Sequence, residues 1–161
     1  MALPNNMQDV SRLKIEEVLL KEGKYVGPTV GISMLPMLKQ RRDTIVVRPK
    51  TEKLKPLDVA LYRRGDDYVL HRVLYPTDSG YVIRGDNCYS DEIVPEEAVL
   101  GVLTEFFHKD KHILCTDEQY LRYARRRVKN YPVRRFFVRL KQKIKNAVKS
   151  VLKFFGYKRK S

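Results

Sequence analysis

The chain has only two cysteines, and it has no apolar run that approaches the roughly 20 residues a membrane-spanning helix needs. Cys88 and Cys115 are not arranged as Cys-x-x-Cys, so free thiols are expected instead of a zinc ribbon or a redox motif. The N-terminus lacks a basic segment followed by an apolar one, so no signal peptide is predicted. We therefore expect a protein of the cytoplasm, or one peripheral on the cytoplasmic membrane, without a transmembrane span.

Acidic residues are absent from the last quarter of the chain. Residues 122–161 contain 16 Lys and Arg and no Asp or Glu, whereas residues 1–121 contain 17 basic and 19 acidic residues, a net charge of −2. The net charge of +14 therefore belongs to the tail and does not describe the body of the protein. With 161 residues, 43% of them hydrophobic, the chain is long enough for one domain with a core, plus appendages.

From residue 25 the sequence alternates short β-rich runs with turn residues, which predicts a small, coiled, mostly β domain within an α+β fold. The six expected strands are Tyr25–Val30, Thr44–Arg48, Val59–Tyr62, Tyr68–Tyr75, Gly80–Arg84 and Val99–Phe107. In the fourth strand the period of two places four side chains on one face, namely Val69, His71, Val73 and Tyr75. His71 is thus expected among apolar neighbours, where desolvation favours the neutral imidazole.

Helical periodicity precedes and follows the β-rich region. Residues 9–22 predict a short amphipathic helix that ends at Gly23, and residues 120–129 predict a basic helix. From Val133 onward apolar residues recur with the spacing of one helical face. These patterns divide the chain into an N-terminal helix (1–24), a β domain (25–107), a connecting hairpin and helix (108–130), and a basic amphipathic helix with its tail (131–161).

Three short segments carry side chains whose chemistries fit together. Ser33 lies in the turn Gly31-Ile32-Ser33-Met34-Leu35-Pro36, His71 lies in an expected strand, and Asp86 lies in the turn Gly85-Asp86-Asn87. Serine becomes an effective nucleophile when a neighbouring base takes its proton, and imidazole does this near neutral pH. A carboxylate on the far ring nitrogen fixes the tautomer and stabilises the imidazolium. Each residue alone is an ordinary turn or core residue, but the ordered set predicts a hydrolase.

At these segments the sequence resembles the S24/S26 serine peptidase superfamily, most closely its signal peptidase I side. Ser33-Met34-Leu35-Pro36 resembles the nucleophile box, Tyr68–Val73 resembles the strand of the general base, and Gly85-Asp86-Asn87 resembles the Gly-Asp-Asn box. Lys55–Tyr62 and Leu100–Leu103 are similar to further strands of the family. The resemblance implies a β domain of signal peptidase/LexA-like type and a serine endopeptidase that cleaves signal or leader peptides without a cofactor. It also implies Ser33, His71 and Asp86 as the catalytic residues.

The departures from the family pattern refine this expectation. His71 stands where bacterial members usually have Lys, which resembles the Ser/His branch, in which the Asp of the Gly-Asp box supports the His. Gly31 stands where some members place a hydroxyl that helps to bind the oxyanion, so we expect this role for the backbone N–H groups of Ser33 and Met34. Members normally carry an N-terminal membrane span, and none is visible here. The substrate is expected to pair as an extra strand.

The basic helix near the C-terminus suits an anionic membrane surface, because cations meet the headgroups while aromatic rings enter the interface. The residues expected at that surface are Arg134, Arg135, Phe136, Phe137, Lys141, Lys145, Phe154 and Phe155. Two alternatives remain, namely packing of the apolar stripe on the β domain and binding of nucleic acid through the basic charges. The second corresponds to a different function, a non-catalytic or self-cleaving LexA-like regulator. The 24 residues before Tyr25 are, however, too short for the helix-turn-helix of such repressors.

The spacing of His108, His112 and Cys115 would suit metal ligands on a helix. The segment resembles a hairpin more than a helix, and a fourth ligand is not evident. We therefore predict no metal.

Overall fold

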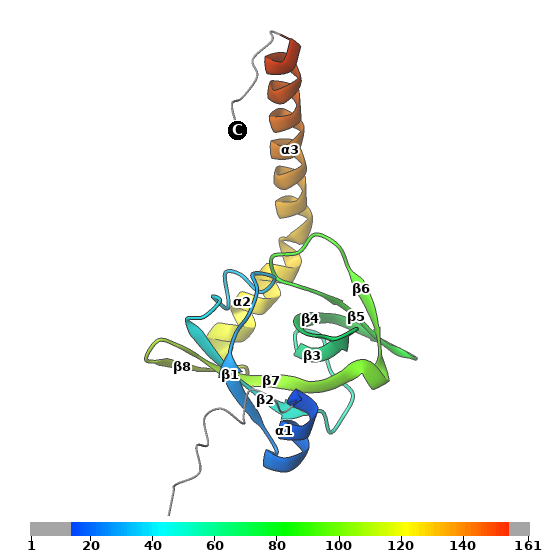
Figure 1. The fold of residues 1–161 in the computed structure, drawn as a ribbon, viewed down its shortest axis with the longest axis vertical. Coiled ribbons are helices and arrows are strands. Elements are labelled where there is room, and N and C mark those ends of the chain that lie inside the picture. Colours follow the sequence, from blue (N-terminus) through cyan, green and yellow to red (C-terminus); the bar gives the residue numbers. More distant parts are fainter. Residues whose placement is uncertain (1–13, 155–161) are drawn as a thin grey trace, which may run out of the picture. The chain divides into compact units, whose positions relative to one another are not determined.

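The computed structural model describes residues 14–154, with Lys153 and Phe154 described by their backbone alone. Over these residues the chain forms an α+β fold in which eight antiparallel strands make one curled sheet, a half-barrel, accompanied by three α-helices (Figure 1). The strands are β1 (Tyr25–Pro28), β2 (Asp43–Pro49), β3 (Val59–Arg64), β4 (Asp67–Thr77), β5 (Gly80–Arg84), β6 (Glu92–Pro95), β7 (Val99–His108) and β8 (Lys111–Leu114). The helices are α1 (Ile15–Glu22), α2 (Glu118–Lys129) and α3 (Tyr131–Phe154), and a short 3₁₀ helix η1 (Glu96–Ala98) precedes β7.

The strands follow the order β1-β2-β7-β3-β4-β5-β6, and β8 pairs with β7. All six strands expected from the sequence are present within a few residues of their predicted bounds, so the mostly β prediction is confirmed at the level of an α+β fold with a curled sheet. The hairpin expected after residue 107 is formed by β7 and β8. β6 was not predicted.

The helices also follow the sequence pattern. α1 ends at Gly23, which adopts a left-handed conformation with φ 67° and donates its N–H to the Leu19 carbonyl at 3.1 Å, an ending that glycine makes at little cost. α1 is described from Ile15, and the predicted helical residues 9–13 lie outside the described residues. Pro132 occupies the first turn of α3, where a missing N–H leaves no hydrogen bond unmade.

Both faces of the curled sheet bury apolar side chains. Alternate residues of β3 enter the two cores, Val59 and Leu61 on one face and Ala60 and Tyr62 on the other. The first core consists of Leu19, Met34, Met37, Leu38, Ile45, Val47, Val59, Leu61, Leu103, Phe106 and Tyr120. The second consists of Leu54, Ala60, Tyr62, Val73, Tyr81, Ile83, Val94 and Val99.

β4 carries His71 into the face of the second core. Its cross-strand partner is Ala60, and Val69 and Val73 pack against that same core, as the alternation predicted. Tyr75 does not share this face, because a bulge between Val73 and Tyr75 pairs it with Val82 and leaves it 53% exposed. The prediction for Tyr75 was therefore wrong, since a period of two does not survive an extra residue in one strand.

Contacts divide the chain into two compact units, residues 1–125 and residues 126–161. The first unit holds the whole sheet, including β8, together with the part of α2 that carries the buried Tyr120 and Ala124. It thus extends past residue 107, where the predicted β domain ends. The described part of the second unit is dominated by α3. In the part of the chain that the structure describes, no helix is both long and apolar enough to cross a membrane.

Candidate active site

Ser33 lies half-buried in the loop of tight turns between β1 and β2. The loop is closed at its base by two backbone hydrogen bonds, from Thr29 N–H to the Asp43 carbonyl and from Arg41 N–H to the Thr29 carbonyl, both 3.0 Å. Met34, directly after the serine, is buried in the first core. Anchoring at both ends and in the middle therefore limits the positions that Ser33 can take.

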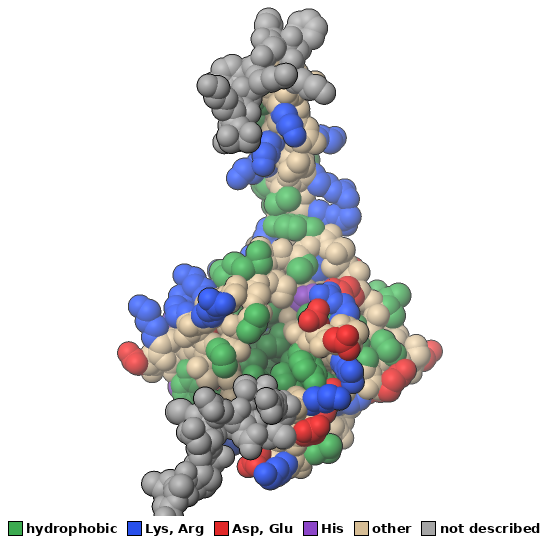
Figure 2. Space-filling model, viewed as in Figure 1, with side chains coloured by type: hydrophobic (Ala, Val, Ile, Leu, Met, Phe, Trp, Pro, Cys, Tyr) green, Lys and Arg blue, Asp and Glu red, His purple; other side chains and the backbone are tan. Residues whose placement is uncertain are grey.

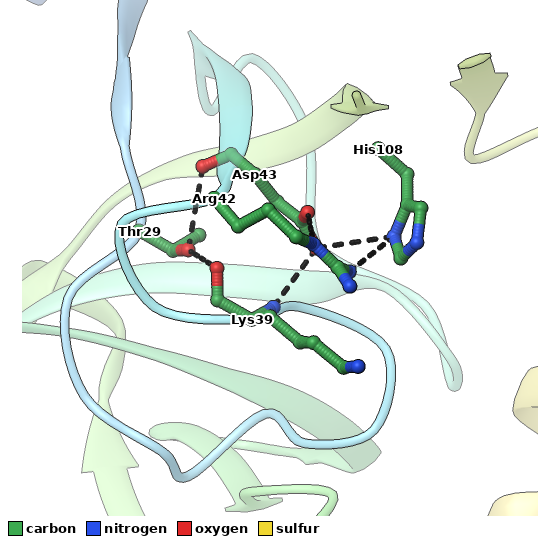
Figure 3. Close-up of polar contacts among 5 residues, drawn as sticks. All are labelled: Thr29, Lys39, Arg42, Asp43 and His108. Carbon is green, nitrogen blue, oxygen red and sulfur yellow. Dashed lines mark hydrogen bonds and ion pairs between the residues drawn. The ribbon is translucent and has the colours of Figure 1, made fainter. Parts of the chain in front are cut away.

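A buried carboxylate strengthens the base of this loop (Figure 3). Asp43 accepts hydrogen bonds from the Lys39 backbone N–H at 2.8 Å and from the Arg42 guanidinium at 2.6 and 3.0 Å, and His108 Nδ1 lies 3.3 Å from it. Thr29 Oγ1 donates to the Lys39 carbonyl at 3.0 Å. Burial opposes ionisation of Asp43, but these hydrogen bonds outweigh it and hold the pKa of the carboxyl below its usual value. The carboxylate thus ties the Ser33 loop to the end of β7.

The Ser33 loop and His71 meet at Gly85. A Cβ on Gly85 would lie 2.8 Å from the Ser33 carbonyl oxygen, 2.9 Å from His71 Nε2 and 2.7 Å from Cys88 Sγ. A side chain at this position would push the three groups apart, so glycine permits their close approach. The Asn87 backbone N–H donates to the same Ser33 carbonyl at 2.7 Å, and its amide donates to the Ile32 carbonyl at 3.2 Å. The turn that follows β5 therefore joins the serine loop to the histidine.

His71 is 3% exposed and presents its two ring nitrogens to different groups. Nδ1 lies 3.1 Å from the Tyr62 hydroxyl and 3.4 Å from Glu92 Oε1, and the Tyr62 hydroxyl donates to Glu92 Oε2 at 2.8 Å. Nε2 faces Gly85 and lies 4.0 Å from Cys88 Sγ. Burial lowers the pKa of His71 and outweighs the opposing effect of Glu92, so the imidazole is neutral around pH 7.

Asp86 does not occupy the place expected for it. Its carboxylate accepts two hydrogen bonds from Arg72, at 2.8 and 2.9 Å, and one from the Tyr123 hydroxyl at 3.0 Å. Among the described residues no hydrogen bond or ion pair joins Asp86 to His71. The reason lies in strand geometry, because adjacent residues of β4 point to opposite faces and Asp86 binds the side chain of Arg72. The position beside Nδ1 belongs to Tyr62 and Glu92 instead.

Sequence reasoning missed both residues at Nδ1. Tyr62 had a detectable signal, since pairing β3 with β4 across the turn at Gly65 sets it diagonally beside His71 on the same face. Glu92 had none, because it begins the four-residue β6 that was not predicted.

The hydrogen bond expected from the Ser33 hydroxyl to His71 is not formed among the described residues. Such contacts are often long in sites without substrate. The backbone N–H groups of Ser33 and Met34, expected to bind the oxyanion, likewise donate to no described residue.

A groove of about 660 Å³ lies beside Ser33. Tyr25 of β1, Ile32 of the serine loop and Leu70 of β4 contribute to its apolar lining, while Arg64 and Asp67 supply charge. On the face that Figure 2 draws, hydrophobic side chains gather in a recessed area of the body. Because β1 is an edge strand of the sheet, one side of its backbone is not paired with another described strand.

His108 and His112, whose spacing would suit metal ligands, both make other contacts. His108 approaches Asp43 and Arg42, and His112 pairs with Glu105. Burial raises the pKa of Cys115 to about 12. Over residues 14–154, no group of three or more His, Cys, Asp and Glu side chains is placed to hold a metal ion.

The expected membrane-surface residues, apart from Phe155, fall on α3. Phe136 and Phe137 are 62% and 61% exposed, and Lys141 and Lys145 are exposed as well, whereas Arg134 and Arg135 are half-buried. Figure 2 shows Lys and Arg side chains along this helix. Phe154 ends α3 without a described side chain, and Phe155 lies outside the described residues.

Comparison with protein-family models, with curated proteins and with solved structures gave no significant match.

Proposed function

We propose that the protein is a serine endopeptidase of the signal peptidase I-like type, in which Ser33 is the nucleophile and His71 the general base. The observation that carries the proposal is the meeting of the Ser33 loop and His71 Nε2 at Gly85, where both lie within 3 Å of the place a Cβ would take. A curled antiparallel sheet agrees with the coiled β domain of signal peptidase/LexA-like type that the sequence motifs imply.

The reaction follows from these positions. In the proposed reaction, Nε2 takes the proton of the Ser33 hydroxyl as Oγ attacks the carbonyl carbon of the peptide. The oxygen that becomes negative accepts hydrogen bonds from the N–H groups of Ser33 and Met34. His71 then gives its proton to the leaving amine, which leaves an acyl-enzyme. A water activated by Nε2 hydrolyses this ester and restores the Ser33 hydroxyl.

The substrate is an extended peptide segment, such as a signal or leader peptide. An added strand beside β1 would satisfy its backbone hydrogen bonds, and its apolar side chains would enter the groove lined by Tyr25, Ile32 and Leu70. Burial of apolar area then supplies affinity at about 25 cal/mol per Å².

Cys88 supplies a rival nucleophile, since its sulfur lies 4.0 Å from His71 Nε2. Burial and the charge of Glu92 raise the pKa of this thiol, which disfavours the reactive thiolate. A peptide library with mass-spectrometric detection of products distinguishes the two. Ser33→Ala should lower cleavage on the order of 10⁴-fold or more, while Cys88→Ala should retain it. Loss of cleavage in Cys88→Ala with full activity in Ser33→Ala would replace the serine mechanism with a cysteine one.

Self-cleavage, as in a LexA-like regulator, would use the same Ser33 and His71 on the protein's own chain. Intact-mass measurement of the purified protein over time separates the two functions. A stable wild-type mass together with cleavage of added peptide supports the endopeptidase.

We propose in addition that α3 binds an anionic membrane surface. Phe136, Phe137 and Ile144 are more than half exposed, and the helix contains no acidic residue. Each Lys or Arg near such a surface contributes about 1 kcal/mol, and apolar side chains in the interface add a part that salt does not screen. Flotation with anionic vesicles tests this proposal, and tight binding to DNA without binding to vesicles would favour a nucleic-acid role.

A further inference from the structure

We propose that Glu92 and Tyr62, not Asp86, orient His71 and decide which of its ring nitrogens carries the proton. This inference rests on the proposed function, in which His71 is the general base. Both residues act through His71 and are therefore positioning residues.

The sheet brings the three side chains together from three strands. His71 on β4 lies opposite Ala60 on β3, and Tyr62, two residues further along β3, is its diagonal neighbour on the same face, with ring centroids 5.8 Å apart. Glu92 on β6 lies opposite Ile83, which in turn lies opposite Val73 of β4. Cross-strand partners share a face, so the Glu92 carboxylate reaches the face of His71 from two strands away.

The position of the imidazole proton follows from counting donors. The Tyr62 hydroxyl has one hydrogen, and it is donated to Glu92 Oε2 at 2.8 Å because an ionised carboxylate only accepts. The Tyr62 oxygen, 3.1 Å from Nδ1, must then accept, so Nδ1 carries the proton of the neutral imidazole. Nε2 then carries the lone pair, and this is the nitrogen that faces Gly85 and the Ser33 loop. The Glu92–Tyr62 pair thus holds His71 in the tautomer that a general base requires.

The charges around His71 give the pair a second effect. Glu92 favours the imidazolium most strongly and Asp86 less so, whereas burial and the charge of Arg64 oppose it. Arg64 also contacts Glu92 at 3.2 Å, and the thiol of Cys88 is the remaining titratable group at Nε2. The imidazolium formed during the reaction is therefore stabilised chiefly by Glu92, 3.4 Å from Nδ1.

Asp86 has a separate structural task. It pairs with the buried Arg72, which also donates to the Leu57 carbonyl at 2.8 Å and to the Tyr120 hydroxyl at 3.0 Å. These contacts join the Gly85-Asp86-Asn87 turn to α2 on the face of the sheet opposite His71.

Glu92→Gln is the decisive variant, because the glutamine amide can donate to the Tyr62 oxygen and reverse the chain of hydrogen bonds. Tyr62 would then donate to Nδ1, and the proton would move to Nε2. We expect kcat/KM to fall on the order of 10²- to 10⁴-fold, and its acid limb to move to lower pH because a charge that raises the pKa of His71 is gone. Tyr62→Phe should cost only about tenfold, since Glu92 can accept from Nδ1 directly. Glu92→Asp keeps the charge and should retain the acid limb of wild type.

Nitrogen NMR of the ¹⁵N-histidine-labelled protein reads the tautomer of His71 without any substrate. The expected result is an Nδ1–H imidazole in wild type and in Asp86→Asn, and an Nε2–H imidazole in Glu92→Gln. If Asp86→Asn does not fold, Tyr123→Phe replaces it, because this variant removes one hydrogen-bond partner of Asp86 and keeps the charge of the Asp86 carboxylate. The inference would be overturned if Glu92→Gln kept both the wild-type tautomer and the wild-type acid limb. It would also be overturned if these two properties changed only in Asp86→Asn or Tyr123→Phe. A failure of the proposed function itself would be recognised separately, because Ser33→Ala would then cleave peptide at the full rate.

Discussion

Asp86→Asn should act on the stability of the fold, and the structure sets the size of the effect. Arg72 is 1% exposed and Asp86 is 4% exposed, so the two charges are paired in the interior with a bidentate geometry of 2.8 and 2.9 Å. Removing one partner of a buried pair costs about 3–5 kcal/mol, because the other charge remains without compensation. Arg72 keeps its hydrogen bonds to Leu57 and Tyr120, so we expect a loss near 3 kcal/mol, at the low end of that range.

Thermal unfolding followed by far-UV circular dichroism measures this loss. At about 2–4 °C per kcal/mol for a chain of this length, Tm should fall by about 10 °C. Asp66→Asn is the matched control, since it removes an aspartate whose ion pair with Arg63, at 3.8 Å, is exposed on both sides. An exposed pair contributes about 0–1 kcal/mol, so the Tm of the control should lie within about 4 °C of wild type. Equal Tm values for Asp86→Asn and Asp66→Asn would refute the structural role assigned to Asp86.

Three further predictions concern the serine loop and α3. Gly85→Ala should abolish peptide cleavage while the fold persists, because its Cβ would lie 2.8 Å from the Ser33 carbonyl and 2.9 Å from His71 Nε2; an active Gly85→Ala enzyme would contradict the close approach. Asp43 has a pKa below its usual value, so its contribution to stability is complete above pH ~4 and is lost as the pH falls through its folded-state pKa. The difference in Tm between wild type and Asp43→Asn should therefore shrink in acid, and a difference that grows on acidification would reverse the assigned sign. Removing residues 131–161 should release the protein from anionic vesicles in flotation, and equal flotation of both forms would mean that α3 is not the membrane contact.

Most of the sheet could be predicted from the sequence, because strands such as Gly80–Arg84 are bounded by turn residues and rich in β formers. β6 could not be predicted because it lacks these features: Glu92-Ile93-Val94-Pro95 is short, begins with a charge and ends with proline. Such a strand is specified by its pairing with β5 and not by its own composition.

In the candidate site, too, some residues could be identified from their sequence motifs, whereas the roles of others depend on how the chain packs. The motifs identified Ser33 and His71, and the structure brings the loop of the first to the ring of the second at Gly85. The role of Asp86 could not be judged from its motif, because it depends on which side of β4 the turn packs. Arg72, next to His71 in sequence but on the opposite face, binds this carboxylate in a way that only the packed structure reveals.

Covalent labelling with a serine-reactive fluorophosphonate, followed by peptide mapping, tests the Ser33–His71 site directly. We predict that the label is found on Ser33 in wild type and in Cys88→Ala, and that labelling is lost in His71→Ala because the hydroxyl then has no base. Absence of label from Ser33 in the folded wild-type protein, or equal labelling in His71→Ala, would contradict a Ser33–His71 active site.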